Sequence, residues 1–344
     1  LQSEILGVLY LDIHEAGSVF NTRDRDIVAN FATQSAIAMN NARIFTREQE
    51  ARRKTEATLQ TFARFVPRQF TERFAEGDIE RLQTGLSREE ELSILFSDVR
   101  GFTSLSESLG PEGTFRLLND YLNSMETPIR GQEGFVDKFI GDAVMALFDS
   151  PAAAVDAGLG MFFELEALNA AQRAAGRDEL RIGIGVNTGD VMIGVVGSRE
   201  RMDTTVMGDA VNTASRIESL TKYYGSSFLI GEKTYEAVKD RGNLMIRFVD
   251  RVQVKGKDDS VNIYEIFNTD PGPVREQKQQ LAPLLAEAMR YYDSGDWAGA
   301  TACFQDYQQR FPEDRLITPF LERCELFRIL PPENWNGVYR LETK

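Results

Sequence analysis

Two aspartates, each beside a strand-like run and in or next to a turn, are the residues of this sequence best suited to chemistry. Asp98 follows the apolar run 94–97, and Asp142 lies with Gly141 in the tight turn of the hairpin pattern 135–148. If the first run pairs with that hairpin, both carboxylates reach one edge of the same sheet. Neighbouring carboxylates raise each other's pKa unless a cation lies between them. Hard oxygen ligands of this kind bind Mg²⁺ or Mn²⁺.

Each aspartate also has an ordinary structural explanation, because Asp after a strand and Gly-Asp in a hairpin are common turn formers. The residues after Asp98 favour the chemical interpretation. A small-residue turn, Gly101, Phe102 and Thr103, opens a helix that we expect to stop at 110–111. Backbone N–H groups at such a helix start bind phosphate oxygens. A carboxylate pair beside a phosphate-binding turn indicates metal-assisted phosphoryl chemistry.

Asn212 and Arg216 form a second candidate group. They are four residues apart and share one face of a helix that Asp209 could cap. An amide and a guanidinium on one face can bind one phosphate, since Arg forms charge-assisted hydrogen bonds with its oxygens. These residues alone leave an alternative open, in which Asn212 is a capping residue and Arg216 an ordinary surface side chain.

Composition excludes several other classes. The 344 residues predict two or three domains, and a net charge of −14 argues against nucleic acid as the partner. We expect no membrane span in this fragment, because no apolar run approaches the ~20 residues that a span needs. One histidine, His14, and two cysteines argue against histidine-dependent hydrolases, zinc sites and disulfide frameworks, and fit a reducing cytoplasm. The chain begins with Leu1 instead of Met, which indicates a piece of a longer protein.

The strands and helices that must position these residues do not alternate regularly along the chain. We expect strands at 91–97, 135–148 (a hairpin), 180–187, 190–196, 227–230, 245–254 and 261–267, and helices at 111–127, 151–175, 209–224 and 232–239. Such a mixture predicts an α+β fold in which helices pack on a sheet.

A long helix is expected before this core. Residues 5–12 have a strand-like pattern, and residues 24–63 contain neither Pro nor Gly. A helix of this length is typical of a coiled-coil signalling connector, although a solvated helix without a partner is the alternative. Pro67 ends it, and a second short helix is expected near 69–74.

Three motifs resemble the class III nucleotidyl cyclases. The family patterns F-x-D-(I/V)-x-G-F-T, K-x-(I/L)-G-D and G-x-x-V-N-x-A-x-R occur here in order at 96–103, 138–142 and 208–216. The resemblance implies a catalytic domain at 89–268 with a palm-like, ferredoxin-like βαββαβ core. It also implies an adenylate cyclase, which converts ATP to 3′,5′-cyclic AMP and pyrophosphate.

The resemblance gives the matching residues their roles. Asp98, Asp142 and the Val99 carbonyl correspond to the ligands of two Mg²⁺ or Mn²⁺ ions per active site. Asn212 corresponds to the residue that orients the ribose, and Arg216 to the one that stabilises charge on the phosphate.

Further matches concern the base and the triphosphate. Lys138 and Thr205 correspond to adenine-selecting residues, Thr being typical of a bacterial and bicarbonate-responsive subgroup, whereas guanine-selective members usually have Glu and Cys or Ser. Lys can donate to adenine N1 and Thr can accept from the 6-amino group. The remaining matches, Arg181 and Lys255, correspond to basic residues that bind the triphosphate.

The resemblance also implies an assembly. In the family the metal aspartates of one protomer face the Asn, Arg, Lys and Thr of the other, so a chain with the full set implies a homodimer with two composite sites. Outside the core we expect the C-terminal part of a GAF domain at 1–45, coiled-coil and transducer helices at 46–88, and a linker with a tetratricopeptide-like helical segment at 269–344.

Two other classes stay open. A catalytically inactive regulatory homologue would lack one of the metal or phosphate residues, and none is substituted here. A diguanylate cyclase would carry a Gly-Gly-Asp/Glu-Glu-Phe signature, which this sequence does not contain.

Overall fold

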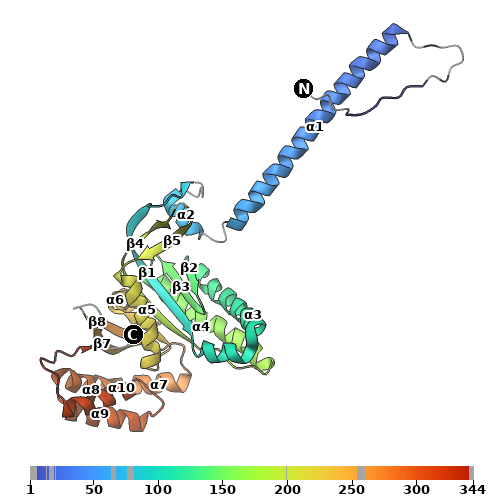
Figure 1. The fold of residues 1–344 in the computed structure, drawn as a ribbon. Coiled ribbons are helices and arrows are strands. Elements are labelled where there is room, and N and C mark those ends of the chain that lie inside the picture. The colour runs from blue at the N-terminus through green and yellow to red at the C-terminus, as the bar shows by residue number, and fades with distance from the viewer. Residues whose placement is uncertain are drawn as a thin grey trace. The chain divides into compact units, whose positions relative to one another are not determined.

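The chain of the computed structural model forms two compact units, Leu1–Val66 and Pro67–Lys344 (Figure 1). The structure describes residues 6–12, 14, 19, 21–62, 67–75, 81–198, 200–253 and 260–340. No helix within these ranges is both long enough and apolar enough to cross a membrane.

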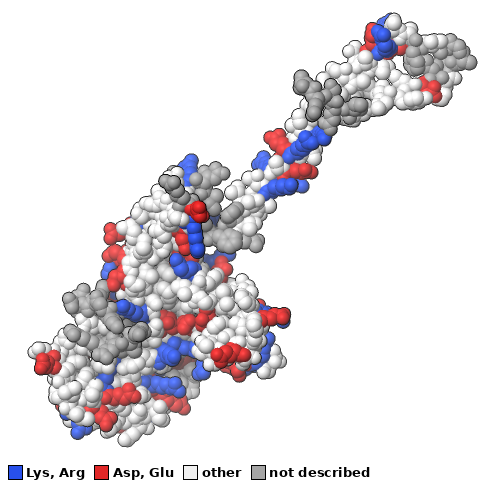
Figure 2. All heavy atoms as spheres, in the orientation of Figure 1, with Lys and Arg blue, Asp and Glu red and all other residues white. Residues whose placement is uncertain are grey.

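The long helix of the first unit, α1 (Thr22–Phe62), confirms the helix predicted at 24–63. It begins two residues early because the Asn21 side chain accepts from the backbone N–H groups of Arg23 and Asp24 and so caps it. Its charged side chains form two groups, at 23–26 and 43–56, separated by an uncharged stretch (Figure 2). The strand predicted at 5–12 is wrong for its described part, because residues 6–12 form no strand and pair with no described segment.

The second unit is built on a mixed sheet whose first half has the predicted βαββαβ order. Strands β1 (Ser87–Val99), β2 (Phe135–Ile140), β3 (Ala143–Phe148) and β4 (Ile182–Gly197) lie in the order β2-β3-β1-β4, each antiparallel to its neighbour. Helices α3 (Phe102–Gly131) and α4 (Pro151–Ala174) form the two crossovers. The ferredoxin-like prediction is therefore confirmed.

The rest of the sheet extends from β4. Strands β6 (Phe228–Gly231), β8 (Ser260–Ile266), β7 (Ile246–Gln253) and β9 (Tyr339–Arg340) follow in that order, and β5 (Met202–Met207) pairs with the far end of β4. The remaining helices are α2 (Arg68–Ala75), α5 (Asp209–Tyr223), α6 (Glu232–Val238), α7 (Gly272–Gln280), α8 (Ala282–Ser294), α9 (Trp297–Arg310) and α10 (Ile317–Ile329).

Two expectations about the strands are wrong. The runs 180–187 and 190–196 are one strand, because β1 pairs with β4 without a break and places Leu92 opposite Gly189, where a turn was expected. Strand β5 was not predicted at all. The stop predicted at 110–111 is confirmed as a kink inside α3, where Gly110 has a non-helical conformation.

The two faces of the sheet are covered by different helices. The β4 side chains of Ile182, Ile184 and Val186 belong to a core shared with α3, α4 and α6. On the opposite face α5 lies directly on the backbone of β4, since a Cβ at Gly185 would come within 2.2 Å of the Glu218 nitrogen. Because successive side chains of β4 point to opposite faces of the sheet, α3, α4 and α6 pack on one face and α5 packs on the other.

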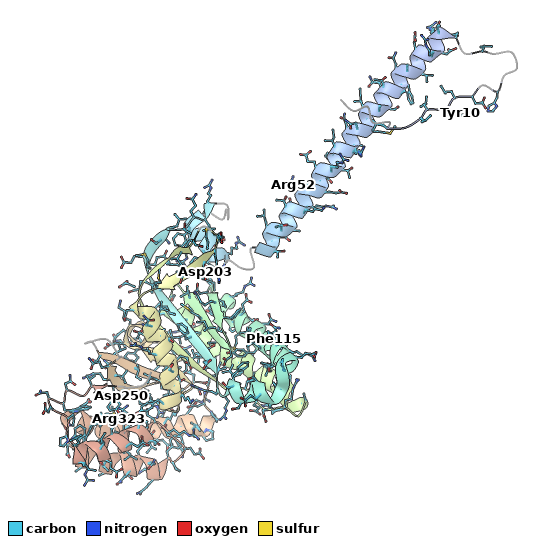
Figure 3. All side chains as sticks on the ribbon, in the orientation of Figure 1. Tyr10, Arg52, Phe115, Asp203, Asp250 and Arg323 are labelled. Atoms are coloured by element: carbon cyan, nitrogen blue, oxygen red, sulfur yellow. The ribbon has the colours of Figure 1, made fainter. Side chains whose placement is uncertain are left out.

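The C-terminal helices α7–α10 are continuous with the cyclase-like core rather than a separate unit. Aromatic and aliphatic side chains of α8, α9 and α10 share one buried cluster with α5, β7 and β8. Within it, Arg323 of α10 donates to Asp250 of β7 at 2.5 Å, and both side chains are nearly inaccessible to solvent (Figure 3). The helical segment expected at 269–344 therefore packs on the core, and its helix pair is part of a group of four helices.

Candidate functional site

The predicted carboxylate pair comes together at one sheet edge. Asp98 lies at the end of β1, opposite Gly183 of β4, and Asp142 lies in the turn between β2 and β3. The next residue pair, Ser97 with Val144, places the β1 end beside that turn. Burial raises the pKa of Asp98 to about 6, and the charge of Asp142 and a hydrogen bond with it add to the increase. The two carboxyl groups therefore interact as the sequence predicted.

This pair fits a divalent cation. A cation between the carboxylates would remove the repulsion that raises the pKa of Asp98, and oxygen donors match Mg²⁺ or Mn²⁺. In the described ranges no cluster of three or more His, Cys, Asp and Glu side chains could hold a metal. The two aspartates would therefore share the cation with backbone oxygen, water or substrate phosphate, as is usual for Mg²⁺.

The raised pKa of Asp98 predicts a pH-dependent effect of Mg²⁺ on thermal stability. Because the folded-state pKa lies above the ordinary value of 3.8, the metal-free protein loses stability as the pH rises towards about 6. A bound cation relieves this loss, whereas below about pH 6 it must displace a proton. We therefore expect saturating Mg²⁺ to raise the unfolding temperature more at about pH 7.5 than at about pH 5, measured by scanning calorimetry.

The matched control is Asp98→Asn, which keeps the shape of the side chain and removes its titration. In this variant the Mg²⁺ effect should be small and equal at both pH values. An equal, large Mg²⁺ effect at both pH values in the unchanged chain would contradict a site at Asp98.

The start of α3 provides free backbone donors next to this pair. Gly101 is its N-cap with φ 69°, a left-handed conformation that favours glycine, and no side chain caps the helix. The first-turn residues Phe102 and Thr103 follow, half-buried and exposed respectively. Uncapped N–H groups at a helix start, one short turn after Asp98, are suited to phosphate oxygens.

Asn212 and Arg216 lie on α5, and both are exposed on its surface. The role predicted for Asp209 is wrong, because Gly208 is the N-cap residue and Asp209 is the first residue of the helix. There the Asp209 carboxylate accepts from the Thr213 hydroxyl at 3.4 Å. An acid in the first turn still complements the helix dipole.

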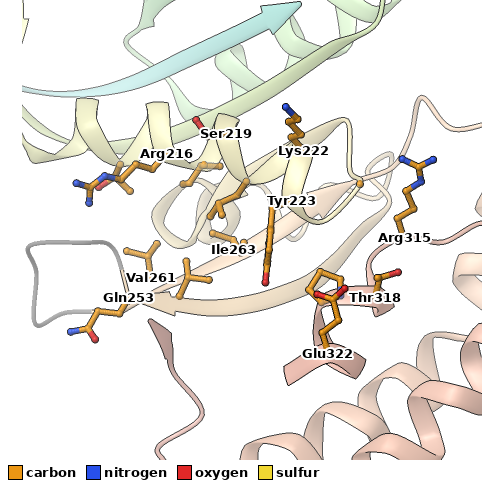
Figure 4. Close-up of a pocket in the computed structure, with 16 residues that line it drawn as sticks. Arg216, Ser219, Lys222, Tyr223, Gln253, Val261, Ile263, Arg315, Thr318 and Glu322 are labelled. Atoms are coloured by element: carbon orange, nitrogen blue, oxygen red, sulfur yellow. The ribbon is translucent and has the colours of Figure 1, made fainter. Parts of the chain in front are cut away.

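A cavity of about 820 Å³ adjoins Arg216, between α5, β7, β8 and α10. Arg216 and Gln253 lie at one end and Arg315 and Glu322 at the other, with the Tyr223 ring between them (Figure 4). Neither of the two aspartates lines this cavity.

The two predicted base-binding residues lie on β2 and β5. Lys138 is 36% exposed, and its ammonium lies 3.3 Å from the fully buried carboxylate of Asp137. Thr205 is half-buried and pairs with Gly194 of β4. Burial raises the pKa of Asp137, the neighbouring Lys138 ammonium opposes this increase, and the charge of Asp203 on β5 adds to it.

The structure describes one of the two basic residues that were predicted to bind the triphosphate. Arg181 is exposed just before β4, and its carbonyl accepts from the Arg100 N–H at 2.7 Å. Lys255 lies outside the described residues. The residue that precedes this gap, Gln253, lines the same cavity as Arg216.

Sequence reasoning missed three residues beside the site: Arg100, Glu218 and Thr221. The Arg100 guanidinium donates to the Thr221 hydroxyl, although 121 positions separate them, and lies 3.7 Å from the Glu218 carboxylate. Burial raises the pKa of Glu218 to about 7. No local pattern could have identified this group, because only the fold brings Arg100 under α5.

Comparison with known proteins gives consistent matches. The family model for the adenylate and guanylate cyclase catalytic domain matches residues 85–268. A protein of Anabaena cylindrica named adenylate cyclase is 42% identical over 220 residues, which cover 62% of this chain and 44% of that protein. A Dictyostelium discoideum protein named adenylate cyclase, terminal-differentiation specific, is 35% identical over 267 residues, covering 76% and 13% respectively.

A solved structure is also similar. The structure of a bacterial light-regulated adenylyl cyclase matches with a TM-score of 0.58 and 25% identity, over 69% of this chain and 69% of that chain. The present chain spans less than half the length of the two curated relatives above.

Proposed function

This chain belongs to the adenylate and guanylate cyclase family, and on that premise we propose that it is an adenylate cyclase. It would convert ATP to 3′,5′-cyclic AMP and pyrophosphate by attack of the ribose 3′-oxygen on the α-phosphorus. The observation that carries this proposal is the interacting pair Asp98 and Asp142 beside the uncapped start of α3. The names of the curated relatives favour ATP as the substrate.

We propose that Asp98, Asp142 and the Val99 carbonyl hold two Mg²⁺ or Mn²⁺ ions. When bound, these ions would lower the pKa of the ribose 3′-hydroxyl and offset the charge of the triphosphate. Asn212 would orient the ribose, and the Arg216 guanidinium would stabilise the charge that develops on the α-phosphate. Positioning and charge stabilisation carry most of such a reaction.

The remaining contacts divide between base and triphosphate. Lys138 would donate to adenine N1 and Thr205 would accept from the 6-amino group. The α3 start at Gly101–Thr103 would bind phosphate oxygens through its N–H groups. Arg181 and Lys255 would add positive charge there, which a chain of net charge −14 needs locally.

We propose a homodimer with two composite sites. The support is that Arg216 lines a cavity to which neither Asp98 nor Asp142 contributes, as expected if Arg216 and the aspartates of one chain serve different sites. In a two-fold dimer the aspartates of one protomer would face Asn212 and Arg216 of its partner, and the symmetry creates this arrangement twice.

The direct test measures cyclic nucleotide production from ATP and from GTP, each with Mg²⁺ and with Mn²⁺. We expect cyclic AMP from ATP and little product from GTP. The double variant Lys138→Glu with Thr205→Cys should raise the ratio of GTP to ATP turnover by about 10²-fold. Each mismatched hydrogen bond to the base costs about 1–3 kcal/mol, and 1.36 kcal/mol is a factor of ten.

The control for the charge reversal is Lys239→Glu, at the exposed end of α6, which should leave the ratio unchanged. Product mainly from GTP in the unchanged chain would contradict the roles of Lys138 and Thr205 but not the family. No product from either nucleotide, in a folded dimer, would contradict catalysis by this chain.

The parts outside the core are proposed to regulate it. We propose that 1–45 is the C-terminal part of a GAF domain, 46–88 a coiled-coil and transducer segment, 89–268 the catalytic domain and 269–344 a linker with a tetratricopeptide-like segment. A signal would reach the core along α1. We propose that the reaction takes place in the cytoplasm, which is supported by a sequence with only two cysteines and by ATP as the proposed substrate.

A further inference from the structure

A partly buried side-chain link joins the metal loop, by which we mean residues 98–100, to helix α5. Arg100 follows Asp98 and Val99, and its guanidinium donates to the Thr221 hydroxyl of α5. The same guanidinium lies 3.7 Å from the Glu218 carboxylate, whose residue is 8% exposed. Thr221 in turn donates to the Glu218 carbonyl. One cation thereby holds two residues of the helix that carries Asn212 and Arg216.

The absence of a side chain at Gly183 leaves space in the sheet for the Arg100 guanidinium. Gly183 lies opposite Asp98 in the ladder of β1 and β4. A Cβ at Gly183 would come within 2.1 Å of an Arg100 guanidinium nitrogen and 2.4 Å of the Thr221 hydroxyl. Any larger residue at this position would therefore displace the guanidinium from α5.

The charge of Arg100 favours the ionised form of Glu218. One Glu218 oxygen, Oε1, is buried without a hydrogen-bond partner, so Arg100 supplies its nearest opposite charge. Without Arg100, this carboxylate would be left buried and uncompensated, which α5 could relieve only by moving or by letting Glu218 take up a proton. A shift of about 1 Å at a catalytic residue can cost about 10²-fold in rate.

We propose that Arg100, held by Glu218 and Thr221, is a positioning residue that sets the placement of Asn212 and Arg216 relative to the metal loop. The inference rests on the proposed function, in which the metal aspartates of one chain and Asn212 and Arg216 of the same chain serve different sites. Arg100 therefore links the metal aspartates of one composite site to the helix that carries Asn212 and Arg216 of the other site. It acts through α5 and touches no substrate.

The test uses heterodimers with a single working site, made from an Asp98→Ala chain and an Asn212→Ala chain. The working site then takes its metal ligands from the Asn212→Ala chain and its Asn212 and Arg216 from the Asp98→Ala chain. Arg100→Met is added to the Asp98→Ala chain alone, which supplies no metal ligand to the working site. We expect kcat to fall about tenfold while the KM values for Mg²⁺ and ATP change less than about twofold.

Two further variants sharpen the result. Arg100→Lys in the same chain keeps a cation near Glu218 and should restore part of the lost kcat. The matched control Arg241→Met removes a half-buried ion pair, with Asp156 at 3.0 Å, that lies away from α5, and should leave kcat unchanged. If Arg100→Met fails to fold, Thr221→Val replaces it, since it removes the hydroxyl and keeps the shape.

Three outcomes separate the possibilities. A fall in kcat with unchanged KM values, absent in Arg241→Met, supports the positioning role. A kcat for Arg100→Met, or for Thr221→Val in its place, equal to that of Arg241→Met overturns it. A parent heterodimer without any activity, before Arg100 is changed, contradicts the shared site of the proposed function instead.

Discussion

Mixing inactive Asp98→Ala chains with inactive Asn212→Ala chains is expected to restore about a quarter of the cyclase activity of the unchanged protein. Random exchange makes about half of the dimers heterodimers, and each of these has one complete site out of two. Alone, Asp98→Ala should lose at least about 10³-fold in rate, because the charge stabilisation that it supports is worth several kcal/mol. Asn212→Ala should lose about 10²–10³-fold. Cyclic AMP formation after co-expression of the two chains measures the recovery.

The control mixes Asp98→Ala with Asp142→Ala. Both changes affect the same half of each site, so every dimer of that mixture lacks a complete carboxylate pair and should stay inactive. Heterodimer formation is verified with two different affinity tags. If proven heterodimers of Asp98→Ala and Asn212→Ala remain inactive, the composite site is wrong.

Replacing Arg323 by Ala is expected to destabilise the second unit by about 3–5 kcal/mol. Arg323 is buried, donates to Asp250 at 2.5 Å and to Tyr224 at 2.9 Å, and lies 3.7 Å from the Tyr339 ring centre. Its removal leaves the Asp250 carboxylate uncompensated at 1% exposure, which is the costly way to break a buried ion pair. Urea unfolding of the full chain, followed by tryptophan fluorescence, measures the loss as a lower midpoint.

The matched control is Arg310→Ala on the neighbouring helix α9. Arg310 also pairs with an acid, Asp306 at 2.7 Å, but the two side chains are 59% and 42% exposed. Exposed pairs of this kind contribute about 0–1 kcal/mol, so the midpoint should hardly move. Equal losses in the two variants would show that Arg323 does not join α10 to the sheet. A large loss in the free energy of unfolding only for Arg323→Ala would show that the C-terminal helices stabilise the core.

Features that are local along the chain can be predicted from the amino-acid sequence alone. Asp142 could be placed because a hairpin turn follows from the apolar runs on either side of it, and Asp98 because a strand ends there. The common face of Asn212 and Arg216 follows from the helical repeat. Their roles still rest on family resemblance, and the structure supplies the placement of their backbone.

The contacts between distant segments depend on the complete fold. The sequence favours two strands, 180–187 and 190–196, yet Gly189 between them lies within β4 because the long strand β1 pairs across it. Arg100 reaches Thr221 over 121 positions, and Arg323 reaches Asp250 over 73. Such contacts depend on the packing of helices on a completed sheet, which no local pattern encodes. The reason is physical: turns and helices are stabilised by near neighbours, whereas buried ion pairs form only once the whole core excludes water.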